Sequence, residues 1–135
     1  MRYLAIDFGE KRTGLAAGDD VMRIATPVEV VRTGSEMERE RLILKAIDRE
    51  GAEALVVGLP LHMDGSEGEN AKRVRGWGES IGKASGLAVH YVDERLTSVA
   101  ANDQMAMSGL THKQKKARRD ALAAAAILRD FLDKL

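Results

Sequence analysis

Three acidic residues occupy positions where a folded domain usually places apolar side chains. Asp7 interrupts the apolar run 3–8, which is typical of a β-strand. Side-chain alternation puts Asp7 on the same strand face as Tyr3 and Ala5, so a strand covered on both faces would force its carboxylate to find a partner. An Asp-x-Gly turn at the end of the strand explains Asp7, taken alone, equally well.

The second acid, Glu94, ends another strand-like run just before a helix start. Ligands of α/β proteins gather at the carboxyl ends of strands, which makes this position suitable for binding. The simpler alternative is a solvated strand end where Asp93 and Glu94 pair with Arg95, and without context that alternative is favoured.

The third acid, Asp120, is the most informative because of the direction in which it points. On a helix over 113–132 it falls inside the apolar stripe that we expect to pack on the sheet, formed by Ala124, Ile127, Leu128, Phe131 and Leu135. The helix dipole favours an aspartate in the first turn, but it does not explain why the carboxylate faces the sheet. We therefore favour a functional role for Asp120.

Carboxylates that point inward have few favourable states. They pair with basic residues, stay protonated or share divalent cations. Ligand sets made only of oxygen select Mg²⁺ or Mn²⁺, and such ions activate water and stabilise the leaving oxygen of a phosphodiester. Binding such a cation is therefore one of the states open to Asp7, Glu94 and Asp120, beside ion pairing and protonation.

Basic residues lie beside each acid in the sequence. Together with two hydroxyl residues at an expected helix start, we predict them to bind a phosphodiester substrate. The set comprises Lys11, Arg12, Arg95, Thr97, Ser98, Lys113, Lys115, Lys116, Arg118 and Arg119. A solvated helix turn explains the run 113–119 equally well, and helix capping is the simpler role for at least one of the hydroxyl residues.

Composition excludes several other classes. The 21 Lys and Arg residues balance 21 Asp and Glu residues, so any attraction to nucleic acid must come from a local patch. The absence of cysteine excludes disulfides and fits a reducing cytoplasm. Aromatic residues, at 4%, are too few for a base-stacking platform. With no apolar run of membrane-spanning length and no signal peptide, we expect a cytoplasmic domain without a membrane partner.

The elements that must position these residues begin with a β-meander over 3–8, 13–18 and 25–32. Ser35 and Glu38 form a capping-box pattern that opens a helix, and Gly51 ends it. The continuous apolar run 54–59 predicts a strand buried on both faces. A helix over 71–84, weakened by three glycines, precedes a strand over 87–92, a helix from 97 or 98 to about 108, and a last helix over about 113–132.

This order, β-β-β-α-β-α-β-α-α, indicates the α/β class. Strands that alternate with helices imply right-handed crossovers and parallel pairing, while the opening hairpins add antiparallel pairs. We expect one mixed sheet of about five strands flanked by helices, in a single domain over 1–135.

In combination, the motifs resemble the YqgF (RuvX) family of the RNase H-like superfamily, to which the RuvC resolvases also belong. The similar stretches follow the family order along nearly the whole chain. They are Ala5-Ile6-Asp7-Phe8-Gly9 with Arg12-Thr13-Gly14, Val57-Gly58-Leu59-Pro60 with Met63-Asp64-Gly65-Ser66, Val92-Asp93-Glu94-Arg95-Leu96-Thr97-Ser98, and Asp120-Ala121 with the alanine-rich helix that follows.

The resemblance implies an RNase H-like fold with strand order 3-2-1-4-5, and a Mg²⁺ or Mn²⁺ site made by Asp7, Glu94 and Asp120. It also implies a nuclease that processes the precursor of 16S ribosomal RNA or resolves Holliday junctions. Two features depart from the RuvC pattern. RuvC carries its second acid on the fourth strand, where this chain has Gly58-Leu59-Pro60, and it has another acid near the last one, where this chain has Ala123 and Ala124.

Three hypotheses follow. The first is a metal-dependent endonuclease acting on structured RNA, as a monomer or homodimer. The second is cleavage of branched DNA, which requires a symmetric dimer with two sites. The third is a non-catalytic RNA-binding factor of ribosome assembly, suggested by the acid set being smaller than that of RuvC.

Overall fold

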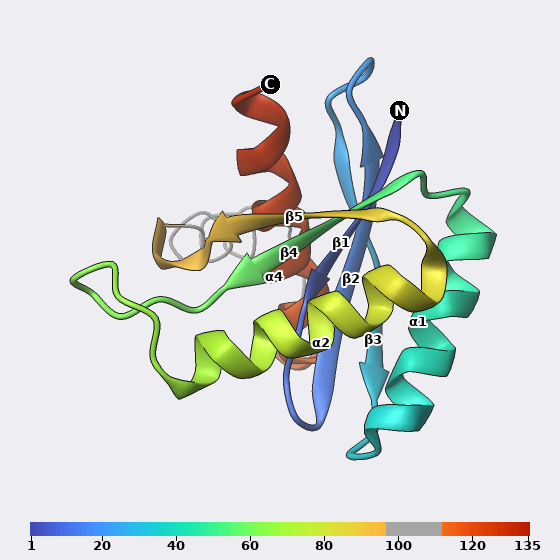
Figure 1. Ribbon diagram of the computed structural model, residues 1–135. Helices are drawn as coiled ribbons and strands as arrows, with labels where there is room; N and C mark the ends of the chain where they lie inside the picture. Colours follow the sequence, from blue (N-terminus) through green and yellow to red (C-terminus); the bar gives the residue numbers. More distant parts are fainter. Residues whose placement is uncertain (97–111) are drawn as a thin grey trace.

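The computed structural model describes residues 1–96 and 112–135, with side chains for 1–95 and 118–135 (Figure 1). Its five strands form one sheet in the order β3-β2-β1-β4-β5. The strands are β1 (Arg2–Asp7), β2 (Arg12–Asp19), β3 (Ala25–Arg32), β4 (Ala54–Leu59) and β5 (Ala88–Asp93). Antiparallel pairing joins β1 to β2 and β2 to β3, and parallel pairing joins β1 to β4 and β4 to β5. The predicted mixed sheet and its strand order are confirmed.

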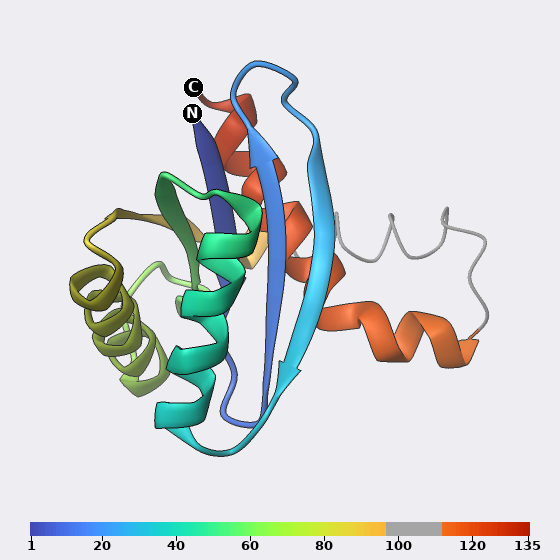
Figure 2. The same ribbon diagram turned by 90° about the vertical axis from the view of Figure 1, so that its right-hand side faces the viewer.

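Helices cover both faces of the sheet. Figure 2 shows α1 (Glu36–Glu50) and α2 (Glu69–Ser85) on one face and α4 (His112–Asp133) on the other. A short 3₁₀ helix, η1 (Glu94–Leu96), follows β5 directly. Within β1, Leu4 and Ile6 enter the core under α1 and α2, while Tyr3 and Ala5 enter the core under α4. Asp7 shares the face of Tyr3 and Ala5, as alternation predicts, and this is the face that α4 covers.

The strand β4, which lies between β1 and β5, is buried along its whole length, and this confirms the interpretation of its continuous apolar run. It separates β1 from β5, so a residue at the end of β5 must cross one strand to reach a residue at the end of β1. Strands in a sheet lie about 4.8 Å apart, and the gap to be crossed is therefore about 10 Å.

Local signals place α1 as expected, with one difference. The Ser35 hydroxyl accepts from the Glu38 backbone N–H at 3.2 Å, and Gly51 ends the helix at φ 66°. The second half of the capping box is missing, because the Ser35 backbone N–H donates to the Thr33 hydroxyl at 3.1 Å and Glu38 binds Arg41. The Ser35 N–H and the Glu38 carboxylate each have another neighbour as partner. The capping-box pattern therefore identified the start of the helix but not both of its hydrogen bonds.

The three glycines in α2 do not break the helix, and two of them permit close packing against β5. A Cβ on Gly78 would lie 2.7 Å from the Tyr91 hydroxyl oxygen, and one on Gly82 would lie 2.8 Å from a Val89 methyl. Without side chains at these two positions, α2 can lie close to β5. This packing offsets the low helix propensity of glycine.

The apolar stripe of α4 is confirmed except at its end. Ala124, Ile127 and Leu128 are buried against the sheet, whereas Leu135 is 54% exposed because the helix ends at Asp133. Leu132 is buried at this end of the helix. The helix predicted from 97 or 98 to about 108 lies outside the described residues. No helix in the described ranges is long and apolar enough to span a membrane.

Candidate active site

Glu94 reaches Asp7 across β4, and a glycine makes this possible. The Glu94 carboxyl carbon lies 3.4 Å from the point where Gly58 would carry a Cβ. Gly58 pairs with Val92 in the β4–β5 ladder, so it lies on the strand between the two acids. Because Gly58 has no side chain, the Glu94 carboxylate can lie over β4 at this point, on the way from the end of β5 to the end of β1.

Asp7 and Glu94 are hydrogen-bonded through their carboxyl groups. Burial, followed by this hydrogen bond and by the negative charges of Glu94 and Asp120, raises the pKa of Asp7 from 3.8 to about 10. Two carboxyl groups in such contact share a proton when no cation lies between them. At neutral pH the metal-free site therefore keeps Asp7 protonated.

Asp120 is positioned by a second close approach of backbone to backbone. Asp7 pairs with Gly14 in the β1–β2 ladder, and a Cβ on Gly14 would lie only 1.8 Å from the Asp120 carbonyl oxygen. The missing side chain lets α4 rest directly on β2 beside Asp7. The Asp120 side chain is 25% exposed and ion-pairs with Arg12, whose Nε lies 3.5 Å from a carboxylate oxygen. The inward direction predicted for Asp120 is correct.

The donor chemistry of these residues fits a hard divalent cation, but the side chains are not arranged as a closed cage. Within the described ranges, no group of three or more acidic or histidine side chains is placed to hold a metal ion. Asp7 and Glu94 touch, while Asp120 turns to Arg12. Oxygen donors, partial burial and mutual repulsion are features that Mg²⁺ or Mn²⁺ would satisfy.

The structure describes the side chains of only some of the predicted basic residues. Four of them are exposed: Lys11 before β2, Arg12 at its start, and Arg118 and Arg119 in the first half of α4. Arg12 contacts Asp120 directly, through the ion pair described above. The side chains of Lys113, Lys115 and Lys116 lie outside the described residues, as do Thr97 and Ser98 entirely.

Arg95 links the end of β5 to the loop that follows β4. Its guanidinium binds both carboxylate oxygens of Asp93 at 2.5–3.0 Å and donates to the Met63 carbonyl at 2.9 Å. The alternative of local pairing at this strand end therefore holds for Asp93, while Glu94 turns to Asp7. Contact of Arg95 with substrate stays a prediction.

Sequence reasoning missed Arg32. It lies opposite Arg12 in the β2–β3 ladder, and with Arg118 it lines a groove of about 180 Å³ between β3 and α4. Glu29 and the apolar residues Pro27, Val28, Val30 and Ala121 complete the lining. Arg32 is far from Asp120 in the sequence. The two come near each other because Arg32 pairs with Arg12 in the sheet and α4 packs across β2 and β3.

This sheet order, with carboxyl groups meeting at the end of its first strand, defines a protein of the RNase H-like class. The structure of T. thermophilus RuvC in complex with a Holliday junction substrate matches with a TM-score of 0.63 and 18% identity, over 99% of this chain and 94% of that chain. A Fowlpox virus resolvase in complex with Holliday junction DNA matches with a TM-score of 0.64 and 10% identity, over 99% of this chain and 98% of that one. At these identities the likeness is one of fold.

The chain belongs to the RuvX family. The model of that family, described as Holliday junction resolvase, matches residues 1–134. A relative from Anaeromyxobacter sp. (strain Fw109-5) is 41% identical over 133 residues, covering 98% of this chain and 97% of the relative. One from Acidiphilium cryptum (strain JF-5) is 40% identical over 134 residues, covering 99% and 85%. Both are provisionally named pre-16S rRNA nuclease, and the predicted family and fold are confirmed.

Proposed function

We propose that this chain is a metal-dependent endonuclease that hydrolyses phosphodiester bonds of structured nucleic acid, with the precursor of 16S ribosomal RNA as its substrate. The observation that carries this proposal is the contact between Asp7 and Glu94, with Asp120 beside them. Curated relatives at about 40% identity, provisionally named for this activity, support the choice of substrate. We place the protein in the cytoplasm, as one domain over 1–135 that acts as a monomer or homodimer.

In this proposal Asp7, Glu94 and Asp120 hold Mg²⁺ or Mn²⁺. When bound, such an ion supplies an activated water and stabilises the charge on the leaving oxygen. Asp7 gives up its proton on binding, and Asp120 exchanges Arg12 for the cation. Lys11, Arg12, Arg118 and Arg119 neutralise the phosphates on either side of the scissile bond.

Metal binding is expected to become tighter as the pH rises. Asp7 holds its proton up to a pKa of about 10, and a metal ion binds the deprotonated carboxylate, so binding displaces a proton. The Mn²⁺ affinity should rise by up to about tenfold per pH unit below that pKa. Titration calorimetry in two buffers of different ionisation heat counts the displaced protons. Binding of Mn²⁺ to the wild type without release of a proton, or with an affinity that does not change with pH, would contradict the assignment.

Soaking crystals in Mn²⁺ tests the location of the site directly. We expect anomalous density among the three carboxylates. Density only elsewhere would remove them as ligands. The substrate itself is tested by incubating the metal-loaded protein with a pre-16S RNA fragment and with a synthetic four-way DNA junction.

The second function, resolution of branched DNA, is favoured by the description of the family model. It needs two sites on a symmetric dimer, so a strict monomer at working concentration counts against it. The third hypothesis, a non-catalytic assembly factor, is supported by the pairing of Asp120 with Arg12. Equal rescue of a null strain by the wild type and by Asp7→Asn would favour it over a nuclease.

The groove between β3 and α4 is expected to hold the nucleic-acid backbone. Replacing both Arg32 and Arg118 by glutamine should weaken binding and lower the slope of log affinity against log salt by about two, one unit for each lost phosphate contact. Fluorescence anisotropy across a salt series, without divalent metal, measures both effects. The turnover at saturating substrate should fall much less than the affinity, because neither residue is a metal ligand in the proposal.

The matched control removes two exposed cations from the opposite side of the sheet, Arg41 and Lys45 of α1. Its salt slope should remain that of the wild type. An equal change of slope in both double variants would show that net charge, and not this groove, governs the affinity.

A further inference from the structure

A buried cation lies behind the candidate active site. Arg39 is only 4% exposed, on the same face of α1 as Ile43, which is fully buried. Charged side chains are rarely buried to this extent unless they are paired. No motif or spacing in the sequence marks this arginine as functional, and the proposed chemistry does not use it.

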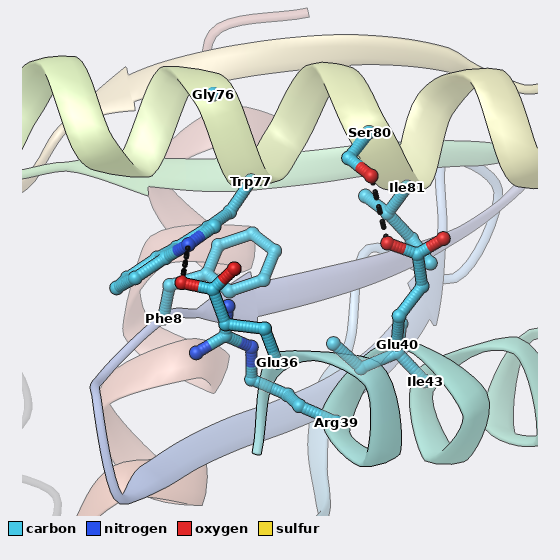
Figure 3. A pocket seen from close by; sticks show the side chains of 9 residues that line it. All are labelled: Phe8, Glu36, Arg39, Glu40, Ile43, Gly76, Trp77, Ser80 and Ile81. Atoms are coloured by element: carbon cyan, nitrogen blue, oxygen red, sulfur yellow. Dashed lines mark hydrogen bonds between the residues drawn. The ribbon is translucent and has the colours of Figure 1, made fainter. Parts of the chain in front are cut away.

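The surroundings of Arg39 are aromatic. Its guanidinium carbon lies 4.0 Å from the centre of the Trp77 ring and 5.3 Å from that of Phe8 (Figure 3). The nearby acids are engaged by α2, since Trp77 donates to Glu36 at 3.1 Å and Ser80 donates to Glu40 at 2.7 Å. The Arg39 guanidinium thus lies against two aromatic rings. The two glutamates that line the same pocket accept hydrogen bonds from α2.

Arg39 donates a hydrogen bond to the turn that joins β1 to β2, directly after Asp7. Its Nη1 donates to the Gly9 carbonyl at 3.1 Å, and the Thr13 hydroxyl donates to the same carbonyl at 3.4 Å. A Cβ on Gly9 would lie 2.3 Å from the Arg12 carbonyl oxygen, so the turn is too tight to adjust freely. Fixing this carbonyl therefore fixes both ends of the turn, Asp7 and Arg12.

A purely structural role does not require a charge here. Even complete buried ion pairs are often replaced by apolar residues of similar volume without loss of stability, so the stability of the core does not by itself explain a buried guanidinium. We propose that Arg39 is a positioning residue of the active site, which holds the turn after β1 so that Asp7 meets Glu94 and Arg12 meets Asp120. This inference rests on the proposed function, because it assigns Arg39 to the nuclease site.

The test compares Arg39→Met with Arg41→Met, an exposed control on the same helix. Methionine keeps the apolar packing and removes the donor to Gly9. In a cooperatively folded Arg39→Met protein, we expect the Mn²⁺ affinity and kcat each to fall at least about tenfold, as for other groups that orient metal ligands. The KM for nucleic acid should stay unchanged. The Arg39→Lys variant, which keeps a donor, should be intermediate.

Wild-type Mn²⁺ affinity and kcat in folded Arg39→Met would overturn the inference. If methionine prevents folding, Arg39→Gln replaces it, because its side chain is too short to reach Gly9 from α1, and the same criteria apply. Amide hydrogen exchange over residues 8–13, which needs neither metal nor substrate, should be faster in the Arg39 variants than in the control. A wild type that binds no Mn²⁺ defeats the proposed function, whereas unchanged exchange defeats the role of Arg39.

Discussion

Replacing Asp7 by asparagine is expected to reduce cleavage at least about a thousandfold and to leave nucleic-acid binding nearly unchanged. The amide cannot supply the charge that holds Mg²⁺ or Mn²⁺, whose contribution to such a reaction is several kcal/mol, and each 1.36 kcal/mol is a factor of ten in rate. Single-turnover cleavage and metal-free anisotropy measure the two quantities separately. Unchanged Mg²⁺-dependent cleavage would refute the assignment of Asp7.

The same substitution is expected to stabilise the metal-free fold at neutral and alkaline pH. The folded protein keeps the Asp7 proton up to a pKa of about 10, whereas the unfolded chain loses it near 3.8. The favourable contribution of this group is therefore complete below about pH 4 and is lost as the pH rises toward 10. Asparagine removes this dependence, and we expect a gain of about 1–3 kcal/mol in the free energy of unfolding at pH 8.

Urea unfolding in a metal chelator at pH 5 and pH 8 checks this expectation. The wild type should lose more stability between the two values than Asp7→Asn does. The matched control is Asp48→Asn, an exposed carboxylate on α1, which should follow the wild type. Equal pH dependence in all three proteins would show that Asp7 ionises freely in the folded state. Added Mn²⁺ should reverse the order, because only the wild type binds it well.

Replacing Gly14 by alanine is expected to have the largest effect on stability. The new Cβ would lie 1.8 Å from the Asp120 carbonyl oxygen and 2.8 Å from the Ala121 nitrogen, both of them backbone atoms that cannot turn aside. The helix α4 must then lift from β2, which costs about 3 kcal/mol, at the upper end of the range for overpacked sites. Because Asp120 moves with the helix, Mn²⁺ binding should weaken as well.

A glycine-to-alanine substitution elsewhere separates steric overlap from backbone effects. Gly76 lies within α2, and a Cβ there meets no atom within 4 Å. Gly76→Ala should therefore raise the free energy of unfolding, by about 0.5–1 kcal/mol, with Mn²⁺ affinity unchanged. Thermal unfolding and calorimetry on both variants complete the comparison. A Gly14→Ala protein as stable as the wild type would show that α4 does not rest on β2 at this point.

The sequence by itself determined features that depend on periodicity and local chemistry. Alternation along β1 assigned Asp7 to the same face as Tyr3 and Ala5, which α4 covers in the structure, and the helical period of α4 turned Asp120 toward the sheet. These predictions succeed because burial of apolar side chains imposes a period of two on strands and of 3.6 on helices. The end of the α4 stripe was wrong, because the helix stops before Leu135.

Only the tertiary structure decided how the acids meet and what surrounds them. The Glu94 side chain can point toward Asp7 because Gly58, which lies on a different strand, leaves space above β4. The pairing of Asp120 with Arg12 and the place of Arg39 behind Gly9 likewise join elements far apart in the chain. No local pattern encodes such contacts, because strand order and the close seating of α4 on Gly14 set the distances between these side chains.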